Sequence, residues 1–240
     1  MTVRPRRLWV TRTAPQAEAT AARLRAFGIE PVIAPVLQVR PIAGARLDLV
    51  GVGALAFTSQ AAVVVFAALS PERSLPVFAV GAATAAAARE AGFSQVLPPP
   101  AQGDVQGLAE LIAAADLWPG PVLNPTAREP AADLAALLAA RGVAARSVAV
   151  YETIRTGLKA APGGLDGVVI HSARAAQAVA DLTGPDQAAS LTAYALSEAV
   201  AASLRRRSFG RILVAERPNE AALMARIRID QDGGGTHQEP

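Results

Sequence analysis

The 240-residue sequence contains no cysteine, which excludes disulfide bonds, thiolate nucleophiles and sulfur-ligated metals. His171 and His237 are the only histidines, so we expect no metal cluster. No stretch approaches the roughly 18 strongly apolar residues of a membrane span. The apolar run Leu8-Trp9-Val10 is also too short for a signal peptide. We therefore expect a cytoplasmic protein that does not enter a membrane.

Lysine and aromatic residues are scarce as well. Lys159 is the only lysine, so arginine carries nearly all of the positive charge. Arginine suits bidentate binding of carboxylates or phosphates, although GC-rich codon usage is the simpler explanation of this bias. The net charge of +3 is too small to indicate a nucleic-acid partner. Hydrophobic residues make up 52% of the chain and aromatic residues 4%, which predicts an alanine-rich, helix-rich core.

Glycine-rich phosphate-binding motifs are missing after the predicted strands, which argues against a dinucleotide-binding or P-loop enzyme. The run Gly233-Gly234-Gly235 lies in the polar segment 230–240, whose composition predicts a disordered tail. The run Arg205-Arg206-Arg207 lies at the C-terminus of a predicted helix, where it complements the helix dipole as a solvated charge run.

The strongest positive signal is a repeat that runs out of phase along the chain. Two distant blocks match at one offset of 113 residues (172 − 59 and 126 − 13): 55–62 with 168–175, and 9–14 with 122–127. The extended matches pair 1–36 with 119–150, and 50–115 with 166–228. We infer two copies of one unit, one of which is inserted into the other. Two similar lobes imply a cleft between them, where a ligand would bind.

Short apolar runs alternate with longer segments of helical period, the pattern of βαβ units. Strands are predicted at 7–11, 31–35, 52–57, 75–80, 95–97, 121–123, 146–150, 166–170, 192–196 and 211–214. Helices are predicted at 15–27, 60–69, 83–91, 104–114, 129–140, 173–182, 198–206 and 220–228. We expect an α/β protein with two similar domains, each a flavodoxin-like, five-stranded parallel sheet flanked by helices.

The phase of the repeat sets the expected domain boundaries. Domain 1 is discontinuous and combines residues 1–37 and 158–240, with domain 2, residues 42–150, inserted in it. The chain crosses between domains at 38–41 and 151–157, where β-favouring residues predict a two-stranded β-ladder linker.

In an open parallel sheet, ligands bind beyond the carboxyl ends of the strands, near helix N-termini. The predicted strand ends carry hydroxyl, amide, glycine, arginine and histidine residues rather than carboxylates. They include Arg12, Thr58, Ser59, Gly81, Thr84, Asn124, Arg128, His171, Ser172 and Ser197. Free N–H groups and hydroxyls form anion sites, although most of these residues, taken singly, also make good helix caps. The set predicts an anion-binding rim, at which Gly81 would let the backbone approach a ligand closely.

Tyr151 ends a predicted strand just before the second crossing and is one of only two tyrosines. It either lies on the hinge side of the cleft, where it could meet a ligand, or is a packing aromatic residue with a hydrogen-bonded hydroxyl.

Several motifs together resemble uroporphyrinogen-III synthases. They are Val10-Thr11-Arg12, Phe57-Thr58-Ser59, Val80-Gly81-Ala82-Ala83-Thr84-Ala85, Val150-Tyr151-Glu152-Thr153 and Val214-Ala215-Glu216-Arg217-Pro218. The resemblance, from about Arg7 to Ile227, implies two α/β domains joined by a β-ladder. It also implies a lyase without cofactor or metal, which acts on hydroxymethylbilane, a linear tetrapyrrole with eight carboxylates. The product would be uroporphyrinogen III, formed with loss of water and inversion of ring D.

The resemblance also assigns residue roles. Tyr151 matches the tyrosine considered as the acid near the leaving hydroxyl, and is the best catalytic candidate. The residues that match cleft-lining positions are Thr58, Ser59, Gly81, Thr84, Ser172 and Ser197. Arg12 and Arg128 are candidate carboxylate clamps by their location.

The sequence departs from the family pattern in two places. Ser197-Glu198-Ala199-Val200-Ala201 stands where many members have Gly-Pro-Thr-Thr-Ala, so two threonine hydroxyls are missing. Asn124-Pro125-Thr126 stands where a glycine-bearing loop is common. Two other classes stay open: a non-catalytic two-lobed binding or sensor protein for a small anion, and a nucleotide-sugar-type transferase, which the lack of an acidic metal motif disfavours. We expect a monomer with a small-molecule partner.

Overall fold

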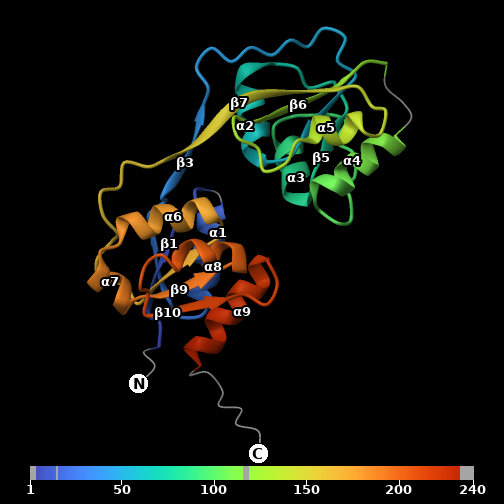
Figure 1. Ribbon diagram of the computed structural model, residues 1–240. Helices are drawn as coiled ribbons and strands as arrows, with labels where there is room; N and C mark the ends of the chain where they lie inside the picture. Colours follow the sequence, from blue (N-terminus) through green and yellow to red (C-terminus); the bar gives the residue numbers. More distant parts are fainter. Residues whose placement is uncertain (1–3, 15, 116–118, 233–240) are drawn as a thin grey trace, which may run out of the picture. The chain divides into compact units, whose positions relative to one another are not determined.

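The computed structural model describes residues 4–14, 16–115 and 119–232. Contacts within the chain divide it into two compact units. Unit 1 comprises Met1–Gln38 and Ile154–Pro240, and unit 2 comprises Val39–Thr153. Unit 1 is therefore built from both ends of the chain, and unit 2 is the continuous segment between them (Figure 1).

The sheet of unit 1 has five parallel strands in the order β10-β9-β8-β1-β2. They are β1 (Arg7–Val10), β2 (Glu30–Ile33), β8 (Gly167–Ile170), β9 (Thr192–Ala195) and β10 (Arg211–Val214). Counted along the unit, the strands lie in the order 2-1-3-4-5 across the sheet, which is the flavodoxin-like order. The predicted parallel sheet is confirmed for this unit.

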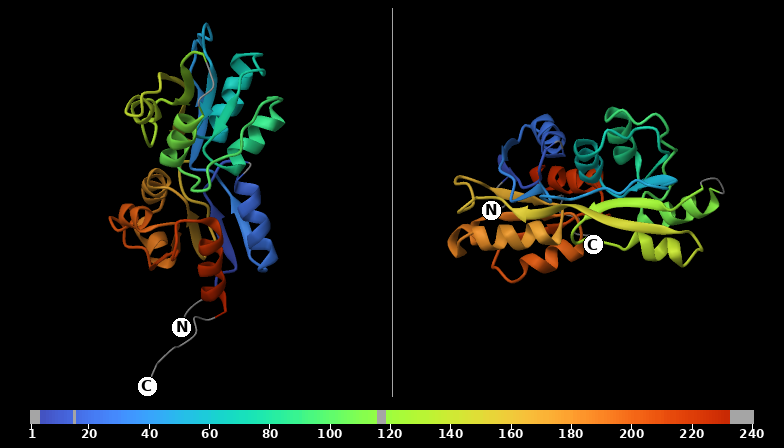
Figure 2. Two further views of the ribbon diagram at one scale, coloured as in Figure 1. Left: turned by 90° about the vertical axis from the view of Figure 1, so that its right-hand side faces the viewer. Right: turned by 90° about the horizontal axis from the view of Figure 1, so that it is seen from above.

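Helices cover both faces of this sheet (Figure 2). They are α1 (Gln16–Ala26), α6 (Ala173–Leu182), α7 (Pro185–Ser190), α8 (Glu198–Leu204) and α9 (Glu220–Gln231). Successive strand residues point to opposite faces. Trp9 accordingly packs with residues of α6 and α8, whereas Leu8 and Val10 pack with α1 and α9. A strand that is buried on both faces must be apolar at consecutive positions, and this explains the short unbroken apolar runs.

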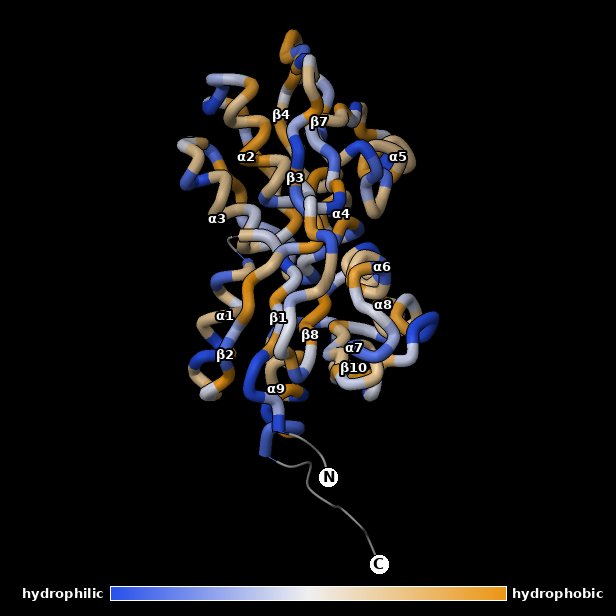
Figure 3. Tube along the Cα trace, turned by 90° about the vertical axis from the view of Figure 1, so that its left-hand side faces the viewer, coloured by the Kyte–Doolittle hydropathy of each residue, from blue (hydrophilic) through white to orange (hydrophobic). Residues whose placement is uncertain are grey.

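The sheet of unit 2 has the order β3-β7-β6-β4-β5. Its strands are β3 (Leu37–Pro41), β4 (Ala54–Phe57), β5 (Val77–Ala79), β6 (Val122–Ala127) and β7 (Ala145–Arg155). Its helices are α2 (Gln60–Leu69), α3 (Ala82–Glu90), α4 (Val105–Ala114) and α5 (Leu134–Ala139). The pairs β4–β5, β4–β6 and β6–β7 are parallel. Figure 3 shows the apolar character of the central strands, among them β4 and β8.

Unit 2 differs from the prediction at one edge of its sheet. The predicted strand 95–97 is reduced to a single parallel bridge between Val77 and Val96. Prolines at 98–100 follow directly, and because proline has no N–H to donate, the ladder stops there. The fifth place in the sheet belongs to β3, which neighbours β7.

Three helical predictions also need correction. The helix predicted at 129–140 begins only at Leu134, because Asp133 is its N-cap and accepts the N–H of Ala136. The short helix α7, with Pro185 in its first turn, was not predicted. Asp230 and Gln231, assigned to the disordered tail, are the last residues of α9. The rest of that predicted tail, with His237, lies outside the described residues apart from Asp232.

The repeat extends to the helix caps. Ser59 and Ser172, which are 113 residues apart (172 − 59), cap α2 and α6. Each Oγ accepts the N–H three residues later, at 3.1 Å. The other equivalent N-caps are Gly81 with Ser197, and Asp104 with Asn219. Helices therefore begin at equivalent positions in the two units.

Among the described helices, none is long and apolar enough to cross a membrane. The same part of the chain holds no group of three or more His, Cys, Asp or Glu side chains that could bind a metal ion.

Candidate functional site

Tyr151 lies in β7 at a β-bulge. Thr126 pairs with Ala149 and the next residue pairs with Tyr151, so Val150 is the extra residue on β7. A bulge of this kind changes the direction of the side chains around it. Tyr151 is only 8% exposed, and its hydroxyl shares a hydrogen bond of 2.9 Å with Ser59 Oγ.

The hydrogen bonds of Ser59 and Tyr151 allow the tyrosine hydroxyl to donate a proton. Ser59 Oγ already accepts the N–H of Ala62 as the cap of α2. A hydroxyl has one proton and two lone pairs, so Ser59 can still donate its own proton to Tyr151. In that arrangement the tyrosine O–H is left to donate to a ligand. The two interpretations made from the sequence, acid or hydrogen-bonded packing residue, are therefore compatible in this geometry.

The residue after Tyr151 pairs with two arginines. Arg40 Nη2 lies 2.6 Å from Glu152 Oε1, and Arg128 Nη1 lies 3.7 Å from Glu152 Oε2. The hydrogen bond from Arg40, together with the charges of both arginines, lowers the pKa of Glu152. Both arginine side chains are more than half exposed. Arg128, predicted to clamp a ligand carboxylate, thus already faces a carboxylate of the protein.

Asn124 does not lie at a strand end, so its predicted place on the rim is wrong. Strand β6 continues to Ala127, and Asn124 is an interior residue that is 2% exposed. Its Nδ2 donates to the carbonyl of Ala56 at 2.8 Å, and its Oδ1 accepts from Ser147 Oγ at 3.2 Å. Asn124 therefore ties β6 to its two neighbouring strands.

The remaining candidates of unit 2 follow β4 and β5. Thr58 is half-buried directly after β4. Gly81 caps α3 with an extended backbone (φ −169°), and a Cβ added there would have no atom within 4 Å. The chain itself therefore does not require glycine at this position. Thr84 lies in the first turn of α3 and is 5% exposed, so little of it can meet a ligand.

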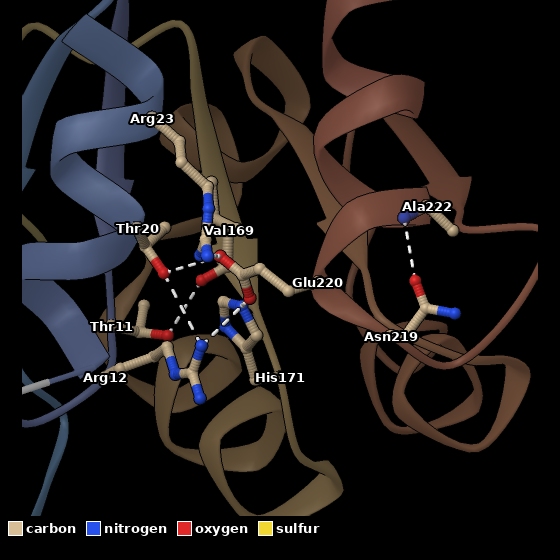
Figure 4. A network of polar contacts seen from close by, with 9 residues as sticks. All are labelled: Thr11, Arg12, Thr20, Arg23, Val169, His171, Asn219, Glu220 and Ala222. Carbon is tan, nitrogen blue, oxygen red and sulfur yellow. Dashed lines mark hydrogen bonds and ion pairs between the residues drawn. The ribbon is translucent and has the colours of Figure 1, made fainter. Parts of the chain in front are cut away.

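In unit 1, Arg12 and His171 converge on a carboxylate that the sequence analysis did not single out (Figure 4). Arg12 follows β1, His171 follows β8, and Glu220 is the first residue of α9. Glu220 Oε2 accepts from Arg12 Nη1 at 2.9 Å and from His171 Nε2 at 2.8 Å. The other oxygen, Oε1, accepts from Thr20 Oγ1 at 2.7 Å.

The protonation states of this network follow from its contacts. Burial alone would raise the pKa of Glu220, but the bonds from His171 and Thr20 and the charge of Arg12 lower it to about 2. Burial lowers the pKa of His171, against the opposing effect of Glu220. At neutral pH, Glu220 is therefore ionised and His171 is neutral, with its proton on Nε2. Glu220 escaped the sequence analysis because an acidic residue in a first helical turn is ordinary.

Three hydroxyl side chains of unit 1 have structural roles, among them the two candidates Ser172 and Ser197. Ser172 and Ser197 cap α6 and α8 with their Oγ atoms, at 3.1 and 3.4 Å from the accepted N–H. Thr11 is 1% exposed and donates to the carbonyl of Val169 at 2.8 Å, which ties β1 to β8. The caps leave Ser172 exposed and Ser197 half-buried, so both remain within reach of a ligand.

Each unit therefore has its own group of polar side chains, near the carboxyl ends of β4 and β6 in unit 2 and of β1 and β8 in unit 1. Unit 2 offers a hydroxyl pair and the arginines around Glu152, and unit 1 offers an arginine–histidine–carboxylate network. These groups can bind carboxylates and donate a proton to a leaving oxygen. Sequence reasoning identified Arg12, Arg128 and His171 but not the carboxylates that they contact, which are Glu152 for Arg128 and Glu220 for Arg12 and His171.

Comparison with known proteins gives one family. The family model described as uroporphyrinogen-III synthase HemD matches residues 18–225. No curated protein matches the chain.

The chain is also similar to solved structures. One is a uroporphyrinogen-III synthetase from Helicobacter pylori, at 18% identity over 92% of this chain and 97% of that chain, with a TM-score of 0.62. Another is a mutant uroporphyrinogen III synthase from Thermus thermophilus, at 18% identity over 92% and 96% of the two chains, with a TM-score of 0.47. The first likeness supports the fold of two helix-flanked, mainly parallel five-stranded sheets.

Proposed function

The chain belongs to the uroporphyrinogen-III synthase family, and from this membership we propose that it converts hydroxymethylbilane to uroporphyrinogen III. The reaction closes the linear tetrapyrrole with loss of water and inversion of ring D. It is a cyclising lyase reaction in tetrapyrrole biosynthesis, and we propose that it proceeds here without a cofactor. The observation that carries the proposal is the match of the family model to residues 18–225.

The reaction depends more on how the enzyme positions the bilane than on a strong nucleophile. Hydroxymethylbilane loses its hydroxyl and cyclises unaided to the isomer in which ring D is not inverted. The enzyme must therefore hold a conformation that leads through a spiro intermediate to the inverted ring. Holding reacting atoms in a productive geometry can supply a large part of a rate difference. Donors for the substrate carboxylates are needed for this, and the strand ends of both units offer them.

In this proposal Tyr151 is the catalytic residue. Its hydroxyl would donate a proton to the leaving hydroxyl, so that water departs, and would recover the proton when the ring carbon loses its own. The hydrogen bond that Tyr151 shares with Ser59 supports this role because it orients the phenol. When Ser59 is the donor, the proton of the phenol is available to the substrate. Arg12 and Arg128 would meet substrate carboxylates, and each unit would add hydroxyl or N–H donors: Thr58, Ser59 and Gly81 in unit 2, and Ser172 and Ser197 in unit 1.

We propose the domain boundaries 1–37 with 158–240, and 42–150, with linkers at 38–41 and 151–157. The division of contacts after Gln38 and after Thr153 supports them. Strands β3 and β7 each run past this division, which supports a two-stranded β-ladder linker. We further propose that the protein is a monomer, which sedimentation equilibrium would test.

The decisive experiment supplies enzymatically generated hydroxymethylbilane, oxidises the products and separates the isomers by chromatography. The type III isomer should exceed the no-enzyme control. Type I product alone, at the level of the control, would reject the synthase activity. Capture of the bilane without any turnover would instead indicate a binding or sensor protein.

A further inference from the structure

Glu220 is surrounded by donors that together resemble a site for a carboxylate ligand. The donors come from two strand ends and from α1. They are Arg12 Nη1 at 2.9 Å and His171 Nε2 at 2.8 Å from Oε2, and Thr20 Oγ1 at 2.7 Å and Arg23 Nη1 at 3.4 Å from Oε1 (Figure 4). We call these four side chains the carboxylate pocket.

The composition of the carboxylate pocket exceeds what one buried glutamate needs. Two guanidinium groups, one imidazole N–H and one hydroxyl face a single carboxylate, so the pocket with Glu220 keeps a formal charge of +1 (two arginines minus one glutamate). Charge-assisted hydrogen bonds of this kind are the usual means by which proteins hold carboxylate ligands. Without the Glu220 side chain the pocket would be a ready anion site.

Among the described residues, His171 forms its side-chain hydrogen bond with the Glu220 carboxylate. Its side chain is only 10% exposed, and its Nδ1 is buried with no hydrogen-bond partner among the described residues. Burying Nδ1 without a partner costs free energy. The hydrogen bond from Nε2 to the Glu220 carboxylate offsets this cost and explains the orientation of the ring. His171 therefore works as a neutral N–H donor.

The carboxylate pocket is not sealed from water. The side chains of Glu220, Arg12 and Arg23 are 20%, 29% and 52% exposed. Glu220 is also the first residue of its helix, and residues 216–219 before it are irregular, so its side chain can turn outward without breaking a helical hydrogen bond. An incoming carboxylate can therefore reach the same donors.

We infer that the carboxylate pocket binds a substrate carboxylate, and that Glu220 occupies the pocket only while substrate is absent. The identity of the ligand rests on the proposed function, whose substrate carries eight carboxylates. Glu220 would then be an internal competitor that keeps Arg12 and His171 oriented between turnovers and weakens substrate binding.

The first test asks whether the pocket binds a free carboxylate. In Glu220→Ala, acetate should shift the His171 ring signals in NMR spectra and raise the melting temperature, whereas chloride at equal ionic strength should do neither. The chain has only one other histidine, His237, which provides an internal reference. The wild type should not respond to acetate because Glu220 fills the pocket. The matched control is Glu198→Ala. Glu198 is also the first residue of a helix, and its carboxylate also pairs with an arginine, Arg205.

The second test measures kinetics with hydroxymethylbilane. The conservative variant Glu220→Gln keeps the volume and one acceptor oxygen but removes the competing charge, so KM should fall by about threefold or more while kcat changes less. Glu198→Gln should leave both constants unchanged. This arm decides the question if Glu220→Ala fails to fold.

The outcomes separate this inference from the proposed function. Two results would overturn the inference: a rise in KM in Glu220→Gln, or a folded Glu220→Ala that does not respond to acetate. Either would show that Glu220 has a structural role and does not give way to a ligand. Both results would leave the proposed function intact if the wild type makes the type III isomer. A wild type without type III product would reject the proposed function, whereas acetate binding by Glu220→Ala would still identify the carboxylate pocket.

Discussion

Replacing Tyr151 by phenylalanine removes one hydroxyl from unit 2 and leaves the packing of the ring in place. The ring belongs to a buried apolar cluster with Leu55 and Phe57, which phenylalanine also fills. Ser59 keeps the N–H of Ala62 and so remains the cap of α2. The loss of stability is therefore limited to one hydrogen bond, about 0.5–1.5 kcal/mol.

The expected loss of activity is larger than this loss of stability. Removing a general acid typically lowers a rate by about 10² to 10⁴. A 100-fold fall in kcat corresponds to about 2.7 kcal/mol of lost transition-state stabilisation. KM should change little, because the phenol would act on the leaving hydroxyl and not on the substrate carboxylates. Initial rates of type III formation, measured against bilane concentration at pH 7, give both constants.

The chain provides a matched control in its second tyrosine. Tyr194 is fully buried and donates to Asp230 Oδ2 at 2.6 Å, and Arg211 Nη2 lies 2.6 Å from the other oxygen of Asp230. Burial and the bond to Asp230 raise the pKa of Tyr194, so it stays protonated at neutral pH. Tyr194→Phe removes the hydrogen bond to the carboxylate of Asp230, which costs about 1.5–3 kcal/mol. It should therefore lower the melting temperature more than Tyr151→Phe does, yet leave kcat unchanged.

The role of Tyr151 would be refuted by unchanged initial rates in a folded Tyr151→Phe protein. Equal losses of kcat in the Tyr151 and Tyr194 variants would refute it as well, since general loosening of the fold would then explain both.

Three further predictions concern stability. Asn124→Ala should cost about 1–3 kcal/mol in denaturant unfolding, because the carbonyl of Ala56 loses its buried partner, while the KM of the folded fraction stays unchanged. Gly81→Ala should leave the melting temperature unchanged, because the added Cβ would meet no atom within 4 Å. Gly120→Ala should lower the melting temperature strongly, because the added Cβ would lie 2.0 Å from the carbonyl oxygen of Gly51 and because Gly120 has a φ of +116°. The folded-state pKa of Glu220 is about 2 against an ordinary 4.5, so its contribution to stability is complete above pH 4.5 and is lost as the pH falls toward 2. The melting temperature should fall less steeply over this pH range in Glu220→Gln than in the wild type.

Much of the fold could be predicted because the signals were local. Strands β1, β4 and β8 are short apolar runs, and Ser59 and Ser172 are ordinary N-caps in front of helical segments. The offset of 113 residues between these serines (172 − 59) then related the two sheets. The strand predicted at 95–97 is a single bridge, because the prolines at 98–100 have no N–H with which to continue the ladder.

The partners within the candidate site could not be predicted in the same way. Arg12 pairs with Glu220, 208 residues away, and Tyr151 pairs with Ser59, 92 residues away. Such contacts depend on the order of strands across a sheet, which a periodic pattern does not contain. The error at Asn124 arises from a strand boundary. The strand predicted to end at Leu123 continues to Ala127, so Asn124 is a buried residue that links neighbouring strands and does not lie at the rim.

The two copies of the repeat keep their backbone positions but differ in the side chains at those positions. Thr58 and His171 stand at equivalent places (171 − 58 = 113), each between the last strand residue and a capping serine. In unit 2 a neutral threonine precedes the serine that contacts Tyr151, whereas in unit 1 a histidine precedes the cap and reaches Glu220. Exchanging them, as Thr58→His or His171→Thr, should therefore be tolerated by the caps, since neither changes a serine. His171→Thr should nevertheless leave Glu220 with one donor fewer and raise its pKa, and NMR titration of the Glu220 side-chain carboxyl against the wild type would detect this. An unchanged titration would mean that Arg12, Thr20 and Arg23 keep the Glu220 carboxylate ionised without His171.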